Sequence, residues 1–117
     1  MRVKWQVVFY TDEDGNEPVK DFIVSQDYAT RARIIHVLDL LHQFNVQLGP
    51  PYAKKIGKSG IRELRIKHAT NIYRIFFFAH TGRKLVLLHA IQKKTDKTPE
   101  SDVRLATARM NEHLSRG

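Results

Sequence analysis

The sequence contains no cysteine among its 117 residues, which excludes disulfide bonds and thiolate metal sites. It has no apolar run close to the roughly 20 residues that span a bilayer. Its first residues include no apolar segment of the kind found in signal peptides. These absences predict a cytoplasmic protein without a membrane partner. At this length a chain can bury roughly two-thirds of its unfolded surface, so we expect one domain over 1–117.

Acidic residues are scarce in one part of the chain. Residues 54–97 contain 12 lysines and arginines but only two acids, Glu63 and Asp96, which gives a surplus of +10. By contrast, residues 1–53 carry a net charge of −2, and residues 98–117 contain three bases and three acids. Such a concentration of positive charge is typical of a surface that binds nucleic acid or an acidic protein. The alternative is a small domain that is simply basic.

Motifs for several common catalytic chemistries are also missing. There is no Gly-rich phosphate loop, no serine nucleophile elbow and no cysteine nucleophile. His36, Asp39 and His42 follow one another at spacings of three in a predicted helix, but they do not form a His-Glu-x-x-His motif. We therefore expect no metal and no other cofactor.

The pattern of apolar residues predicts an α+β fold in the order β-α-α-β-β-β-α. Strands are expected at 3–10, 61–67, 71–80 and 84–92, and helices at 18–24, 26–44 and 99–114. The first strand is expected to join the other three in one sheet, covered by the apolar stripes of the two long helices (Ile34, Leu38, Leu41; Val103, Met110). Gly49, Pro50 and Pro51 are expected to end the second helix and turn the chain. Thr98 is the expected N-cap of the last helix, with Pro99 as its first residue.

Two arginines lie within apolar strands, where a core alone would not need them. Because side chains alternate across a sheet, Leu64 and Ile66 should point to one face, and Arg65 should lie on the open face. Arg74 belongs to a strand that is apolar on both sides, so we expect it to be partly enclosed with an anionic partner. A bound phosphate and a structural ion pair with Glu63 are both open as that partner.

The last predicted strand ends in a cluster of basic side chains. His89 lies late in an otherwise apolar segment and is followed by Lys93 and Lys94. A lone strand histidine is often structural. Cleavage of RNA needs proton transfer and charge stabilisation at one phosphate, however, and this cluster supplies groups for both.

These segments resemble the toxins of the RelE/ParE superfamily, in particular its HigB-like, phage-derived branch. The resemblance covers nearly the whole chain and is most specific in 60–65, 72–76 and 88–99. The last segment is close to the branch pattern His-Gly-Phe-x-Lys-Lys-Thr-x-Lys-Thr-Pro, with Ala90 and Ile91 in place of Gly and Phe. The resemblance implies a RelE-like fold, a small antiparallel-rich sheet flanked by helices.

The resemblance also implies a function. It indicates the toxin of a type II toxin–antitoxin pair, an endoribonuclease that cuts mRNA, commonly on the ribosome. Its partner would be a helix-turn-helix antitoxin encoded by the adjacent gene, and promoter DNA would be bound only through that complex. By position the catalytic residues become Arg65, Arg74, Lys93 and Lys94, with His89 as a further candidate. The other lysines expected to bind RNA are Lys54, Lys55, Lys67 and Lys97. Some relatives orient a base with a C-terminal tyrosine, but this chain has no tyrosine after Tyr73.

The expected reaction needs no metal. The ribose 2′-OH attacks the adjacent phosphate and leaves a 2′,3′-cyclic phosphate and a 5′-OH. Arg65 and Arg74 would clamp the phosphate. Lys93, Lys94 or His89 would take the proton of the 2′-OH, because neighbouring cations favour the neutral form of a lysine. Three other functions stay open: a ParE-like inhibitor of DNA gyrase that cuts nothing, a non-toxic phage-derived nucleic-acid binder, and a degenerate toxin.

Overall fold

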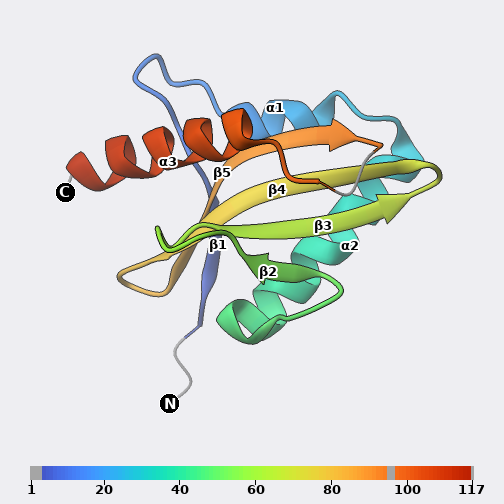
Figure 1. Ribbon diagram of the computed structural model, residues 1–117, viewed down its shortest axis with the longest axis horizontal. Coiled ribbons are helices and arrows are strands. Elements are labelled where there is room, and N and C mark those ends of the chain that lie inside the picture. The colour runs from blue at the N-terminus through green and yellow to red at the C-terminus, as the bar shows by residue number, and fades with distance from the viewer. Residues whose placement is uncertain (1–3, 95–96, 117) are drawn as a thin grey trace.

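The computed structural model describes residues 4–94 and 97–116, and it shows an α+β fold (Figure 1). The strands are β1 (Gln6–Phe9), β2 (Ala53–Lys55), β3 (Arg62–His68), β4 (Asn71–His80) and β5 (Lys84–Lys93). The helices are α1 (Pro18–Val24), α2 (Tyr28–Phe44), a short 3-10 helix η1 (Asn45–Gln47) and α3 (Glu100–Ser115). This arrangement is compatible with a RelE-like fold, as the sequence predicted.

All five strands form one sheet in the order β1-β5-β4-β3-β2. The predicted pairing of the first strand is confirmed for the described residues, since β1 runs parallel to β5 with Val7 opposite Leu85. Val3, with which the predicted strand began, lies outside the described residues. The remaining pairs are antiparallel. The turn expected at 81–83 joins β4 to β5, and Gly82 adopts a φ of 80° there.

Two helices cover one face of the sheet and one helix covers the other (Figure 1). Helices α1 and α2 pack on one face, where Ile34 and Leu41 join a core with alternate residues of β3, β4 and β5. Helix α3 crosses the other face, where Ala106 and Met110 contact a smaller core that includes Phe76 and Leu88. The predicted packing of both apolar stripes is confirmed, with Leu38 and Val103 partly buried beside them. Strand β4 is therefore covered on both sides over most of its length.

The structure corrects the sequence prediction at three points. Strand β2 was not predicted, because the three residues Ala53–Lys55 are too few to show an alternating pattern. Helix α2 ends at Phe44, as predicted, but the residue that ends it is the C-cap Asn45, with a φ of 48°, and not the Gly-Pro-Pro segment that follows at 49–51. Helix α3 begins at Glu100, so Pro99 occupies the N-cap position without a side-chain capping hydrogen bond, and the hydroxyl of Thr98 hydrogen-bonds elsewhere.

Candidate functional site

A buried carboxylate lies at the centre of the basic part of the sheet. Glu63 of β3 is 0% exposed, and three cations surround it. Its Oε2 lies 3.4 Å from Arg74 Nε, while its Oε1 lies 3.8 Å from Arg65 Nε and 3.9 Å from Lys54 Nζ. Thr98 donates a hydrogen bond of 2.7 Å to Oε2. We call these five residues the Glu63 cluster.

The register of the sheet explains why the Glu63 cluster forms. Lys54 lies opposite Glu63 across β2 and β3, and Arg65 lies opposite Arg74 across β3 and β4. Directly opposed residues share one face of a sheet, so all four side chains point to the face that α3 crosses. The segment before α3 then brings Thr98 onto the carboxylate. The prediction that Arg65 faces away from Leu64 and Ile66 is confirmed, since those two lie in the core on the other face.

Arg74 is enclosed more fully than the sequence indicated. The expectation of partial enclosure is wrong, because the side chain is 0% exposed. Of the two partners left open for Arg74, the ion pair with Glu63 is present, so Arg74 has a structural anionic partner. In this conformation no atom of the Arg74 side chain is open to a ligand. Arg65 is 22% exposed and Lys54 is 46% exposed, so these two present the positive charge of the cluster to the outside.

His89 connects the sheet to α3. Its Nε2 lies 2.7 Å from Asp102 Oδ1, and Arg109 approaches its Nδ1 at 3.3 Å. Because an arginine can only donate, Nδ1 accepts and Nε2 carries the proton donated to Asp102. The ring also stacks on Phe76 at 5.8 Å between centroids. Both ring nitrogens thus have partners on α3, which fits the structural role that sequence reasoning had left open.

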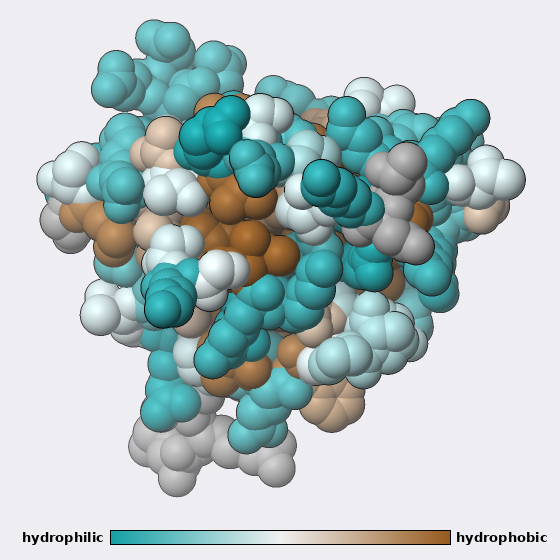
Figure 2. All heavy atoms as spheres, viewed as in Figure 1, coloured by the Kyte–Doolittle hydropathy of each residue, from teal (hydrophilic) through white to brown (hydrophobic). Residues whose placement is uncertain are grey.

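Two further lysines, Lys67 and Lys93, lie at the margin of this face. Lys67 and Lys93 both lie opposite Ile72 across the sheet, so they form the next row beyond Arg65 and Arg74. Both are exposed, as are Lys94 and Lys97 on either side of the undescribed pair 95–96. Figure 2 shows hydrophilic side chains around an apolar patch next to α3.

One RNA-binding candidate is not brought to the Glu63 cluster. Lys55 lies opposite Arg62 in the sheet register, and adjacent residues of a strand point to opposite faces. Its side chain therefore points away from the face that carries Lys54 and Glu63, and it lines a separate pocket at the β2–β3 hairpin.

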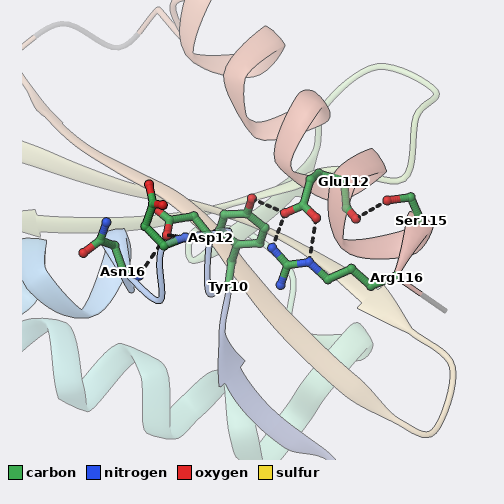
Figure 3. A network of polar contacts seen from close by, with 7 residues as sticks. Tyr10, Asp12, Asn16, Glu112, Ser115 and Arg116 are labelled. Carbon is green, nitrogen blue, oxygen red and sulfur yellow. Dashed lines mark hydrogen bonds and ion pairs between the residues drawn. The ribbon is translucent and has the colours of Figure 1, made fainter.

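The far end of α3 is fixed by a second polar network (Figure 3). Tyr10 donates a hydrogen bond to Glu112, which also pairs with Arg116. Burial, followed by the hydrogen bond to Glu112, raises the pKa of Tyr10 to about 12. The same hydrogen bond, together with Arg116, lowers the pKa of Glu112. Nearby, burial first and then His80 lower the pKa of His113.

Sequence reasoning missed several of these contacts. It named Glu63 only as a possible ion-pair partner, although parity already placed it on the same face as Arg65. Asp102 lies in the first turn of α3, where the helix dipole favours an acid, and it also binds His89 from there. Within 4–94 and 97–116, no group of three His, Cys, Asp or Glu side chains could hold a metal ion. No helix in these ranges is long and apolar enough to cross a membrane.

The fold and this charged face together define a class, the small α+β proteins with a RelE-like sheet. The sequence model of one family, the phage-derived protein Gp49-like family (DUF891), matches residues 21–111. The chain therefore belongs to that family, which is part of the RelE/ParE-like toxin superfamily. A search of curated proteins finds no match. The matched range includes the Glu63 cluster and most of α3 but not Tyr10, Glu112 or Arg116, and the match assigns no role to any residue.

Proposed function

We propose that this protein is a HigB-like toxin of a type II toxin–antitoxin system that cuts mRNA without a metal. The observation that carries the proposal is the pair Arg65 and Lys54, two accessible cations held on one sheet face around the buried Glu63. The buried carboxylate holds the two cationic side chains in position. Their solvent-exposed parts can then bind a phosphate. Membership in a toxin family supports the same assignment at a coarser level.

In the proposed reaction, the 2′-OH oxygen forms a bond to the adjacent phosphorus, and the bond from phosphorus to the 5′ oxygen breaks. The products are a 2′,3′-cyclic phosphate and a 5′-OH. Arg65 and Lys54 hold the phosphate and stabilise the charge that develops on its oxygens. Lys93 or Lys94 takes the proton of the 2′-OH, and the departing 5′ oxygen receives a proton from the same basic group of residues.

Arg74 and His89 act indirectly in this proposal. Arg74 is fully buried against Glu63, so it positions the carboxylate that holds the two accessible cations. His89 positions α3 through Asp102 and Arg109. Lys67 and Lys97, both exposed, extend the RNA-binding surface beyond the reacting phosphate.

The proposed partners follow from the charge of this face and from the superfamily. A neighbouring gene would encode a helix-turn-helix antitoxin that covers the basic face, and promoter DNA would be bound only by the complex. The mRNA would be cut in the cytoplasm, preferentially on the ribosome, and free RNA would also be cut at a high concentration of the protein. Exposed charge pairs are screened by salt, so the toxin–antitoxin complex should weaken at high ionic strength.

The proposal is tested with purified protein and a labelled RNA oligonucleotide that contains a mapped cut site. We expect cleavage in the presence of EDTA and a 2′,3′-cyclic phosphate on the upstream product. A matched oligonucleotide with a single 2′-deoxy sugar at the cut should resist cleavage, because the attacking group is missing. Equal cutting of both oligonucleotides, or dependence on a divalent metal, would overturn the mechanism.

A further inference from the structure

A cleft lies beside the Glu63 cluster, between α3 and the hairpin that follows β2. It has a volume of about 370 Å³ and is lined by Ile56, Thr98, Glu100, Val103 and Arg104. This volume is within the range of about 300–1,000 Å³ that is usual for small-molecule sites. Figure 2 shows the corresponding apolar patch below the first turns of α3, framed by hydrophilic side chains.

The walls and the rim of the cleft differ in chemistry. Ile56 and Val103 are both partly buried and supply apolar surface from two different elements. At the rim, Glu100 is 90% exposed and Arg104 is 73% exposed, with 3.9 Å between their charged atoms. The cleft therefore offers an apolar space with a hydrogen-bond acceptor and a donor at its opening.

The cleft and the Glu63 cluster share a wall. Thr98 lines the cleft and at the same time donates its hydroxyl hydrogen to Glu63. The other oxygen of Glu63 lies within 4 Å of the two accessible cations, Lys54 at 3.9 Å and Arg65 at 3.8 Å. A group bound in the cleft is thus placed next to a phosphate bound by those cations.

We propose that this cleft binds one nucleobase of the RNA, on a nucleotide adjacent to the phosphate held by Lys54 and Arg65. The inference rests on the proposed function. A base has two flat faces that suit the apolar walls and a polar edge that suits Glu100 and Arg104. Its own phosphate carries the negative charge that the neighbouring cations attract. The chain would in this way position a base without the C-terminal tyrosine that it lacks.

The test compares cleavage preferences of matched variants. Purified protein is given a pool of RNA oligonucleotides with a randomised segment, and the 5′ ends of the products are sequenced. We expect the wild type to favour one base next to the cut and Val103→Ala to reduce that preference about tenfold, since small changes in an apolar pocket have effects of this size. Leu105→Ala, an equivalent truncation on the exposed side of the same helix, should keep the preference.

A second variant guards against a folding defect. Arg104→Ala removes a side chain that is mostly exposed, so its fold should be intact and its base preference should also fall. A wild type with no preference next to the cut overturns the inference, as does an unchanged preference in both variants. The inference also fails if the two variants only weaken binding of the antitoxin, because the cleft then serves the protein partner. A wild type that cuts no RNA overturns the proposed function itself, which distinguishes the two failures.

Discussion

Replacing Glu63 by glutamine tests the energetic centre of the site. The amide keeps the shape of the side chain and can still accept the hydrogen bond from Thr98, but it removes the negative charge. Lys54 and Arg65 are partly exposed, so water screens their pairs and their loss costs little. Arg74 is 0% exposed and cannot be rehydrated without movement. Removing one partner of a buried ion pair costs about 3–5 kcal/mol, because the other charge stays buried without compensation. This is a large part of the roughly 5–15 kcal/mol that stabilises a domain.

The assay is a double-mutant cycle in chemical denaturation, with Glu63→Gln, Arg74→Met and the double variant. Each single variant should lose about 3–5 kcal/mol of unfolding free energy, which for Glu63→Gln corresponds to a fall in Tm of roughly 10–20 °C. The double variant removes both buried charges at once, so it should be more stable than the sum of the single losses predicts, by at least about 2 kcal/mol. Thr98→Val provides a matched control, because it deletes one hydrogen bond and should cost only about 1–3 kcal/mol.

Additive losses would refute this reasoning. If the double variant loses the sum of the two single losses, Glu63 and Arg74 do not stabilise each other. The Glu63 cluster would then owe its geometry to the sheet alone.

Four further predictions concern Arg65, the polar network at the end of α3, and the partner protein. Arg65→Ala should reduce RNA cleavage by about 10²–10³ while the Tm changes little, because the side chain lies at the surface of the cluster; normal cleavage by a folded variant would remove Arg65 from the site. The pKa of Tyr10 is raised to about 12 from 10.0, so its stabilising contribution is complete below pH 10.0 and is lost as the pH rises through about 12. Raising the pH through this range should therefore lower the free energy of unfolding of the wild type more than that of Tyr10→Phe, as chemical denaturation at each pH would show. The pKa of His113 is lowered from 6.5, so its contribution is present above pH 6.5 and is lost as the pH falls through the lower folded value; His113→Gln should lose less stability than the wild type between about pH 7 and about pH 5. Co-expression with each adjacent reading frame should identify one that restores growth and co-purifies, and failure of both would favour a solitary nucleic-acid binder.

Much of the fold could be predicted from the sequence, since its main elements carry strong local signals. The alternation of residues in 61–67 placed Arg65 and Leu64 on opposite faces, and the helical stripe of Ile34 and Leu41 gave the packing of α2. Strand β2 could not be predicted, because it exists only through pairing with β3. Its sequence, Ala-Lys-Lys, has no strand pattern of its own.

The candidate site was only partly predictable, because contacts between distant residues decide it. Glu63 was one of two partners left open for Arg74, and the complete burial of both residues depends on α3 and the segment before it. Thr98 looked like a helix cap by its position next to Pro99, yet its hydroxyl binds a carboxylate 35 residues away. The local pattern around His89 gave no sign of Asp102, which reaches it only after α3 folds back over the sheet.

The most direct test of the central claim is to map RNA 5′ ends in cells after induced expression of the wild type and of Arg65→Ala. We expect new cuts within translated messages for the wild type and almost none for the variant at equal protein level. Intact RNA together with stalled DNA replication would contradict it and would favour an inhibitor of DNA gyrase.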